Sequence, residues 1–255
     1  MKTTIKLQKP DYGNWVSLNF VYVPGVLGII FLSLALLTIF WLIPAAVFLL
    51  VSIYFFNARY QFSPGGRDIQ HQIRTLLMQH LDWDGKGQAL DIGCGNGALS
   101  IDLAQKYPAS LVTGIDTWGG NWEYSHKVCE TNAEIEGVKP RIMFRKASAS
   151  TLPFEDESFE VAVSNLVFHE VSTALDKRVL IREALRVVKK GGKFAFQDLF
   201  FSKNFYGDPE DLLETIEGWG ISKVELIETR KASFIPGLLK LPFMLGDIGL
   251  IVGEK

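Results

Sequence analysis

A long segment without any Asp, Glu, Lys or Arg, from Tyr12 to Ala58, most constrains how this chain can fold. As one α-helix it would be about 70 Å long, at ~1.5 Å per residue, whereas the hydrocarbon core of a bilayer is about 30 Å thick. One crossing cannot use this length, but two can. Pro44 interrupts the segment, and Trp41 suits a membrane interface. We therefore predict a membrane hairpin with spans at about 15–40 and 41–60, of which the second could also take a tilted, shallow or re-entrant course.

Basic residues flank the charge-free segment on both sides. They are Lys2, Lys6 and Lys9 before it, and Arg59, Arg67 and Arg74 after it. Because basic residues favour the cytoplasmic side of a membrane, both ends of a two-span hairpin should lie there, together with the rest of the chain. Two alternatives are a cleaved signal peptide and a buried hairpin of a soluble protein. The segment is too long and begins too late for a signal peptide, and soluble helices would carry polar faces.

Beyond a polar turn at Pro64, Gly65 and Gly66, strand-like apolar runs alternate with helical patterns. Such alternation is typical of a doubly wound α/β fold, in which helices cover both faces of a mostly parallel sheet. The strand-like runs lie at 88–93, 110–116, 141–147, 159–165, 192–200, 222–228 and 247–255. The last two have no long helix pattern between them, so a hairpin connection should make the seventh strand antiparallel. We predict a membrane hairpin over 1–60 and a seven-stranded domain over 61–255, with an apolar insertion at 231–247.

The charge balance and the cysteines disfavour several classes of function. The formal net charge is -2, so the chain lacks the basic excess that attracts nucleic acid, and no nucleic-acid partner is expected. Cys94 and Cys129 do not have the spacing of a disulfide framework or of a zinc site. We predict two reduced cysteines and no metal site.

A glycine-rich turn, from Gly93 to Gly97, separates the first strand-like run from a helical pattern. Glycines in such a turn let the backbone approach a ligand closely. The spacing Gly93-x-Gly95-x-x-Ala98, with Asp116 ending the next strand, also satisfies the dinucleotide fingerprint. The turn therefore predicts a nucleotide-type ligand, and an NAD-linked oxidoreductase is one alternative. A tight turn that binds no ligand is another.

Three separated segments carry a resemblance to a known family. They are "LDIGCGNGAL" with "GID", then "KASASTLPFEDESFEVAVSNLVFHEV", and then "EALRVVKKGGKFAF". In this order they resemble the class I S-adenosylmethionine-dependent methyltransferases, and most of all the group that contains the quinone-biosynthesis C-methyltransferases. The resemblance covers Asp91 to the C-terminus and leaves out the charge-free segment. It implies S-adenosylmethionine as the cofactor, and the "STLPFEDESFEVAVSN" segment and the terminal hairpin disfavour the NAD-linked alternative.

The resemblance also implies which residues bind the cofactor. Asp116 should bind the ribose hydroxyls, and Thr117 and Trp118 should lie beside the adenine. The methionine portion should contact Asp91, Gly93, Cys94, Gly95, Asn96, Gly97 and the backbone of Asn165. Ser148 stands where the group often has Asp. We therefore expect Ser148, or the backbone of Ala149, to replace that carboxylate near the adenine amine.

The catalytic residues depend on the chemistry of methyl transfer. Transfer of a methyl group from a sulfonium is an in-line displacement, so alignment of the reactants supplies much of the rate. A base is needed only when the nucleophile arrives protonated. His169 follows the fourth strand-like run, where the methyl group should emerge, and its ring titrates near neutral pH. A His there also recurs in the resembled group as a helix-start residue, and Glu170 and Asp198 are the alternative catalytic residues.

Together these features predict a membrane-anchored methyltransferase whose partners are the lipid bilayer and a small apolar, amphipathic or lipid acceptor. The apolar insertion at 231–247 would be either a lid on the domain or an anchor in the membrane interface. The alternative is a membrane-tethered scaffold or cofactor-binding protein that performs no catalysis. Loss of the glycines or of Asp116 would favour that alternative, and the sequence retains them.

Overall fold

The computed structural model describes residues 9–119 and 124–255, which divide into two compact units. One unit joins Ile73–Lys255 to the segment before Gly13, and it contains the whole sheet. The other unit, Gly13–Gln72, contains two apolar helices and the start of a third.

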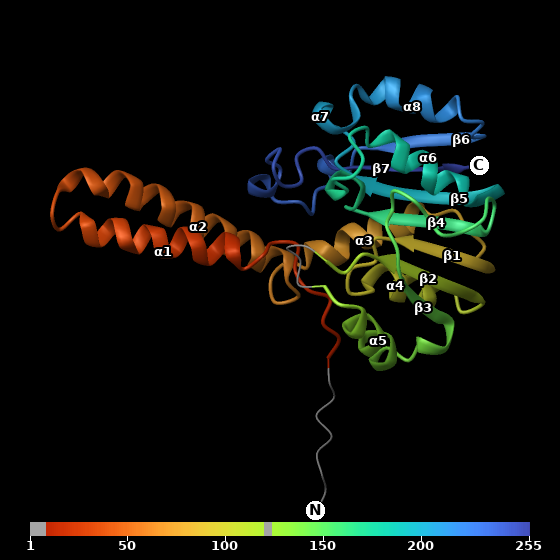
Figure 1. Cartoon of the computed structure of the whole chain (residues 1–255), viewed down its shortest axis with the longest axis horizontal. Helices are drawn as coiled ribbons and strands as arrows, with labels where there is room; N and C mark the ends of the chain where they lie inside the picture. Colours follow the sequence, from red (N-terminus) through yellow and green to blue (C-terminus); the bar gives the residue numbers. More distant parts are fainter. Residues whose placement is uncertain (1–8, 120–123) are drawn as a thin grey trace, which may run out of the picture. The chain divides into compact units, whose positions relative to one another are not determined.

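Seven strands form one mixed sheet in the order β3-β2-β1-β4-β5-β7-β6 (Figure 1). The strands are β1 Gly87–Ile92, β2 Ser110–Asp116, β3 Ile142–Lys146, β4 Phe159–Asn165, β5 Val188–Asp198, β6 Lys223–Ile227 and β7 Gly249–Glu254. Neighbouring strands pair in parallel except at β7, which is antiparallel to both β5 and β6. The predicted seven-stranded α/β sheet with an antiparallel last strand is therefore confirmed.

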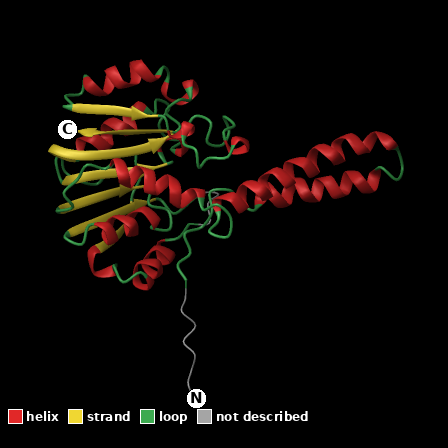
Figure 2. Cartoon of the chain, turned by 180° about the vertical axis from the view of Figure 1, so that it is seen from behind, coloured by secondary structure: helices red, strands yellow, loops and turns green. Residues whose placement is uncertain are grey.

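Helices cover both faces of this sheet (Figure 2). They are α3 Ile69–His80, α4 Ala98–Lys106, α5 His126–Ile135, α6 Arg178–Arg186, α7 Lys203–Tyr206 and α8 Pro209–Glu217. Successive residues of a strand point to opposite faces. Ala89 accordingly belongs to an apolar cluster with Leu77 of α3 and Leu99 of α4, whereas Leu90 belongs to a second cluster with residues of α6 and α8. The central strands β1, β4 and β5 are thus buried on both faces over most of their length, whereas the edge strands β3 and β6 are partly exposed.

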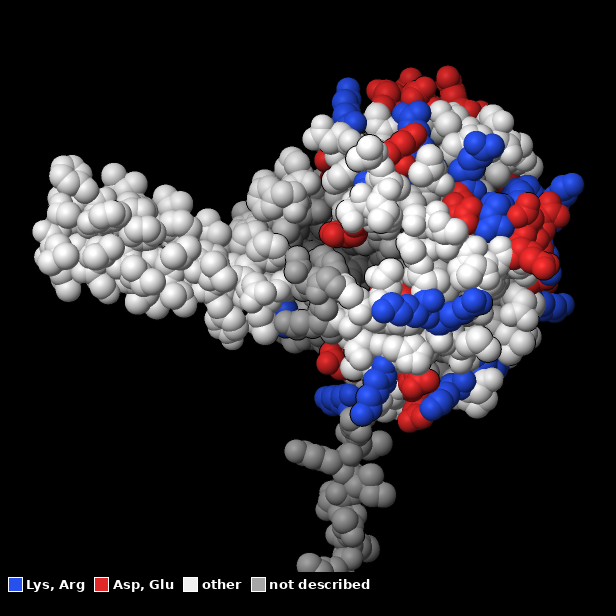
Figure 3. Space-filling model, in the orientation of Figure 1, with Lys and Arg blue, Asp and Glu red and all other residues white. Residues whose placement is uncertain are grey.

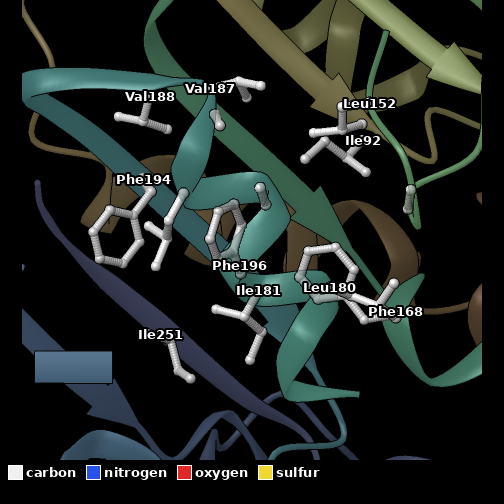
Figure 4. Close-up of a cluster of buried hydrophobic side chains, with 14 of the residues drawn as sticks. Ile92, Leu152, Phe168, Leu180, Ile181, Val187, Val188, Phe194, Phe196 and Ile251 are labelled. Carbon is white, nitrogen blue, oxygen red and sulfur yellow. The ribbon is translucent and has the colours of Figure 1, made fainter. Parts of the chain in front are cut away.

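The second cluster contains the largest buried side chains of the sheet unit (Figure 4). Phe194 and Phe196 of β5 have ring centroids 5.4 Å apart, and Phe168, which follows β4, lies 5.5 Å from Phe196. Burial of such a side chain contributes roughly 1.5–3 kcal/mol. This packing fixes the carboxyl ends of β4 and β5 relative to each other. It therefore also positions the residues that follow the two strands.

The segment before Gly13 packs on the sheet unit through α5. The backbone N–H of Asp11 donates to Asn132 Oδ1 over 2.8 Å, and Asn132 Nδ2 donates back to the carbonyl of Asp11 over 2.8 Å. The Tyr12 hydroxyl donates to Glu136 over 3.4 Å, and the Arg74 guanidinium lies 5.7 Å from the centre of the Tyr12 ring. Asp11, just before the charge-free segment, and Tyr12, its first residue, therefore belong to the sheet unit, although Gly13–Gln72 form the other unit.

The other unit is an apolar helical hairpin, formed by α1 Asn19–Leu34, the short helix η1 Ile39–Trp41 and α2 Leu42–Phe62. Its two long helices lie side by side (Figure 1). Gly28 faces Leu49, and a Cβ atom at Gly28 would come within 2.8 Å of that side chain. Close to it, the Ser52 hydroxyl donates to the carbonyl of Val21 over 2.8 Å. Small residues and interhelical hydrogen bonds of this kind are typical of helix pairs in membranes.

The outer surface of the apolar hairpin is mostly hydrophobic, although Asn19, Ser33, Thr38 and Asn57 are also exposed. Figure 3 shows its surface white along most of its length, whereas Lys, Arg, Asp and Glu gather on the sheet unit. Its large side chains that are at least half exposed are Phe20, Tyr22, Val23, Val26, Ile29, Leu36, Leu37, Ile39, Phe40, Ile43, Val47, Leu50, Ile53, Phe56 and Tyr60. Among the described residues, Ile39–Phe62 is the one helix long and apolar enough to span a membrane, and Asn19–Leu34 is shorter. The first helix is thus shorter than the predicted 15–40, because Ala35–Leu37 turn the chain before Ile39.

Candidate functional site

The glycine turn follows β1 and is held in place by the end of β2 and by Val167. The N–H groups of Gly93 and Cys94 both donate to the carbonyl of Ile115, over 2.7 and 2.9 Å. Gly93 has a φ of +75°, and a Cβ atom there would lie 2.2 Å from Val167, so no other residue fits. At Gly95, with a φ of +56°, the nearest atoms to such a Cβ belong to Tyr124 at 3.6 Å. The Tyr124 ring is thus at ordinary contact distance from this Cβ position, and the turn has no space there for a side chain larger than a methyl group.

Asp116, at the carboxyl end of β2, lies directly beside the glycine turn. Its Oδ2 accepts a hydrogen bond from the N–H of Gly95 over 2.9 Å, and its Oδ1 accepts one from the N–H of Trp118 over 2.8 Å. A carboxylate oxygen has two lone pairs, so one remains on each oxygen for a ligand hydroxyl. The carboxylate is half-buried and stays accessible. This is the position expected of a residue that holds two adjacent hydroxyl groups.

Trp118 lies against the glycine turn and borders a cavity. Its indole N–H donates to the carbonyl of Gly95 over 2.9 Å, and its ring meets His126 edge-on at 4.8 Å. The cavity is a hollow that opens widely to the surface, with a volume of about 450 Å³, and the described residues that line it are Trp118, Tyr124, Ser125, His126 and Lys146. Thr117, also predicted here, is exposed. His126 was not predicted as a site residue, because its place depends on how α5 packs on β3, which no local pattern reveals.

Several predicted ligand contacts support the turn from inside the fold. Asp91 is buried and accepts a hydrogen bond from Ser100 over 2.6 Å, and burial raises the pKa of Asp91 to about 7. Asn96 Oδ1 accepts from the N–H of Ser125 over 3.0 Å, which ties the turn to the start of α5. Cys94 is a buried free thiol, as is Cys129, whose Sγ donates to the carbonyl of Gly95. Direct contact of Asp91, Cys94 or Asn96 with a ligand stays a prediction.

The remaining predicted contacts lie at the ends of β3 and β4. The Ser148 and Ser150 hydroxyls are 2.8 Å apart, in a turn joined to β2 by the hydrogen bond from the N–H of Ala147 to the carbonyl of Asp116. Ala149 is buried beside them. Asn165 ends β4, and its Oδ1 is buried without a hydrogen-bond partner among the residues that the structure describes. A buried acceptor without a donor is costly, so a ligand that donates a hydrogen bond would satisfy it.

A second group of polar side chains gathers where β4 and β5 end. Asp198 is fully buried, and its Oδ2 accepts from the N–H groups of Val167, Phe168 and His169 over 3.1, 2.8 and 3.3 Å. Its Oδ1 accepts from the N–H of Leu199 over 2.7 Å and lies 2.6 Å from His169 Nδ1. Asp198 thus shapes the loop that carries His169 and orients its ring at the same time.

The protonation state of His169 follows from these contacts. Burial disfavours the charged ring, but the Asp198 carboxylate outweighs burial, and the pKa of His169 is raised to about 10. Glu170 Oε1 lies 3.4 Å from the other ring nitrogen, and this contact with His169 holds the pKa of Glu170 below its ordinary range. At neutral pH His169 is therefore an imidazolium that can donate a hydrogen bond, and it can accept a proton only after losing its own.

Tyr206, in the short helix α7, completes this group and was not predicted from the sequence. It is 1% exposed, and its hydroxyl has no hydrogen-bond partner among the described residues. Burial, and then the nearby Asp198 carboxylate, hold the pKa of Tyr206 well above its ordinary value. Its neighbour Phe205 has its ring 5.9 Å from that of His169. No sequence signal marks Tyr206, because a tyrosine in a short connecting helix is ordinary.

The two groups of residues lie along one edge of the sheet. The glycine turn follows β1, Asp116 ends β2, Asn165 ends β4 and Asp198 ends β5. These strands are consecutive neighbours in the sheet and run in parallel, so their carboxyl ends meet at the same edge. Ligands of doubly wound folds bind at this edge.

Comparison with known proteins gives a consistent result. Residues 90–196 match the family described as "Methyltransferase domain". The sterol 4-C-methyltransferase of Caenorhabditis elegans is 28% identical over 168 residues, which cover 64% of this chain and 48% of that protein. The malonyl-[acyl-carrier protein] O-methyltransferase of Geobacter sulfurreducens is 33% identical over 130 residues, which cover 50% of this chain and 45% of that protein. This chain thus spans about half the length of the curated relatives it matches.

Among solved structures, the fold is similar to that of geranyl diphosphate C-methyltransferase from Streptomyces coelicolor, which was determined with S-adenosyl-L-homocysteine bound. The TM-score is 0.56 at 15% sequence identity, and the match covers 74% of this chain and 80% of that one. At this identity the likeness concerns the fold of the sheet unit.

Proposed function

Because this chain belongs to the class I S-adenosylmethionine-dependent methyltransferases, we propose that it transfers a methyl group from S-adenosylmethionine to a small apolar, amphipathic or lipid acceptor. The carboxylate of Asp116, hydrogen-bonded to Gly95 with a lone pair left on each oxygen, is the observation that supports this function most. We propose that Asp116 binds the ribose of the cofactor, as the resemblance to the family implies.

The residues at the carboxyl edge of the sheet fit S-adenosylmethionine. Asp116 keeps a lone pair on each carboxylate oxygen and can accept from ribose hydroxyls. The unsatisfied Oδ1 of Asn165 can accept from an ammonium group, which is a feature of the methionine portion. Trp118 and His126 border a cavity large enough for part of a nucleoside. The sequence predicts a contact of the cofactor with the backbone of Asn165, and the contact with its side chain is an addition to that prediction.

The chemistry divides between the bound cofactor and the residues around it. S-adenosylmethionine, when bound, supplies an activated methyl group on a sulfonium. The chain positions the reactants through the glycine turn and Asp116, which accounts for much of the expected acceleration. His169, oriented by Asp198 at the same edge, either donates a hydrogen bond to the acceptor as an imidazolium or, above its pKa, removes a proton from it. Glu170 is the exposed carboxylate of the group and the alternative base.

We further propose that the apolar hairpin anchors this enzyme in a membrane with two spans and with the sheet unit on the cytoplasmic side. The large exposed apolar side chains of α1 and of α2 support lipid contact, and neither helix carries a charge before Arg59. The close packing of Gly28 on Leu49 supports a helix pair that crosses as one unit. Basic residues on both sides of the segment support the orientation.

The cofactor role of Asp116 can be tested by replacing it with Ala. The change removes charge-assisted hydrogen bonds worth ~1.5–3 kcal/mol in total, so S-adenosylmethionine should bind about tenfold more weakly or worse. Isothermal titration of the full chain in detergent measures this, with NAD as the competing ligand class. Asp82→Ala is the matched control, since the Asp82 side chain is 96% exposed and should not affect binding. Unchanged affinity in a folded Asp116→Ala variant would disprove the assignment, and tight binding of NAD would disprove the proposed function.

The two-span topology can be tested by labelling single cysteines in sealed vesicles of known orientation. Leu36 lies between the two helices and is 89% exposed, and Leu175 lies in the sheet unit and is 100% exposed. Two full crossings put Leu36→Cys and Leu175→Cys on opposite sides of the membrane, so a membrane-impermeant maleimide should label one in right-side-out vesicles and the other in inside-out vesicles. Cys94 and Cys129 are buried and should react little. Labelling of both positions from the same side would indicate a re-entrant hairpin instead.

A further inference from the structure

The segment between β6 and β7, residues 228–248, is an ordered part of the sheet unit; Figure 1 draws it in indigo near the end of the sheet. Ile235, Leu239 and Leu245 are at most 3% exposed and fix its inner side to the domain. Short backbone hydrogen bonds fold it on itself, for example from the N–H of Leu245 to the carbonyl of Leu239 over 2.9 Å. The segment therefore presents a defined outer surface.

That outer surface is apolar. Leu238 is 66% exposed, Leu241 is 36% exposed and Phe243 is 65% exposed, and all three lie within six residues of the chain. Ile235, Leu239 and Leu245 of the same segment are buried, so the exposed apolar side chains form one outer side of the segment. Exposed apolar side chains gathered in this way indicate a surface that contacts something other than water.

A basic residue, Lys240, lies within the exposed apolar stretch, and this combination fits the surface of an anionic bilayer. The segment contains three basic residues, Arg230, Lys231 and Lys240, and two acidic ones, Glu228 and Asp247. Arg230 and Lys231 both pair with Glu228, over 3.0 and 2.8 Å. Lys240 lies between Leu239 and Leu241, next to the exposed apolar side chains. Apolar side chains bordered by basic ones are typical of protein surfaces that enter the headgroup region of an anionic membrane.

The segment lies at the edge of the sheet that carries the candidate active site. The N–H of Phe201 donates to the carbonyl of Asp247 over 3.0 Å, and the Arg230 guanidinium lies 4.0 Å from the centre of the Phe201 ring. Asp198 pairs with Gly249 at the end of β5. A bilayer in contact with the segment would therefore lie next to the residues that surround His169.

We infer that the β6–β7 segment is a second membrane contact, in which Leu238, Leu241 and Phe243 enter the interface of an anionic bilayer. The consequence is that the acceptor reaches the active site from the lipid phase beside this segment. The inference rests on the proposed membrane residence of the chain, and it distinguishes an interfacial anchor from a lid closed over the domain.

Spin labels on the full-length protein test this inference in vesicles of phosphatidylcholine and phosphatidylglycerol. A label on Phe243→Cys should be several-fold more accessible to oxygen, which partitions into lipid, relative to a water-soluble nickel chelate, than a label on Met143→Cys. Met143 is the matched control, because it is also 65% exposed but lies on β3. Leu238→Cys gives a second position, so that the result does not depend on one substitution. Wild-type protein treated with the label reports any reaction of the native cysteines.

A spin label on Val47→Cys reports on the membrane anchor itself, because Val47 lies in α2 and is 53% exposed. It therefore distinguishes failure of this inference from failure of the anchor. A water-accessible label at Phe243 together with a lipid-exposed label at Val47 would overturn the inference and leave the anchor intact. Water-accessible labels at both positions would overturn both. Magnetic broadening between labels at Phe243 in neighbouring copies would show that a second copy of the chain covers the segment, which also overturns the inference.

Discussion

Replacing Asp198 with Ala should lower the free energy of unfolding by about 3–5 kcal/mol. The buried Asp198 carboxylate accepts from four backbone N–H groups and from the ring of His169. Its removal leaves these donors, one of them charged, without an acceptor inside the fold. Urea denaturation followed by near-ultraviolet circular dichroism measures the loss.

An exposed carboxylate gives the matched control for this variant. Asp156 pairs with Arg186 over 2.7 Å, but its side chain is 76% exposed, so Asp156→Ala should cost less than about 1 kcal/mol. Equal effects of the two changes would show that Asp198 does not organise the loop after β4.

The same pair makes stability depend on pH in a defined direction. The pKa of His169 is raised from its ordinary 6.5 to about 10, so this stabilisation is fully present below pH 6.5 and is lost as the pH rises through 10. Between pH 8 and pH 10.5 the wild-type chain should lose roughly 2–3 kcal/mol more than Asp198→Asn, in which burial alone acts on the ring. Asp91 titrates near pH 7 and adds little in this range. Parallel curves for the two proteins would contradict the charged pair.

Replacing His169 with Ala should lower turnover by about a hundredfold or more if the ring removes a proton from the acceptor, while S-adenosylmethionine affinity stays nearly unchanged. Because only the neutral ring is a base, the wild-type rate should then rise about tenfold per pH unit until the pH approaches 10. Turnover can be followed with isotopically methyl-labelled S-adenosylmethionine and a lipid and metabolite extract, with mass spectrometry of the products.

Two further variants distinguish catalysis by His169 from its other roles. His80 is at the exposed end of α3, and His80→Ala should leave turnover unchanged. Glu170→Gln keeps the loop but removes the alternative base. Near-normal turnover in a folded His169→Ala variant, with a flat pH profile, would mean that alignment of the reactants suffices for the reaction.

The sequence determined the features that depend on neighbours along the chain. The segment without charge from Tyr12 to Ala58 predicts two apolar helices joined by a break, and α1 and α2 occupy most of it. Gly93, Gly95 and Gly97 between a strand and a helix predict a tight glycine turn, and all three residues have a positive φ in the structure. Alternating strand and helix patterns likewise predict the doubly wound sheet.

The tertiary structure decided which distant residues meet and what that does to their chemistry. His169 and Asp198 are 29 residues apart, and they pair only because β4 and β5 are neighbours in the sheet. Their pairing reverses the expected protonation of His169, whose sequence suggests titration near neutral pH and whose surroundings keep it charged. The unsatisfied Oδ1 of Asn165 arises in the same way. A sequence pattern records local periodicity and spacing, whereas burial and the pKa of a buried group depend on what the fold packs around it.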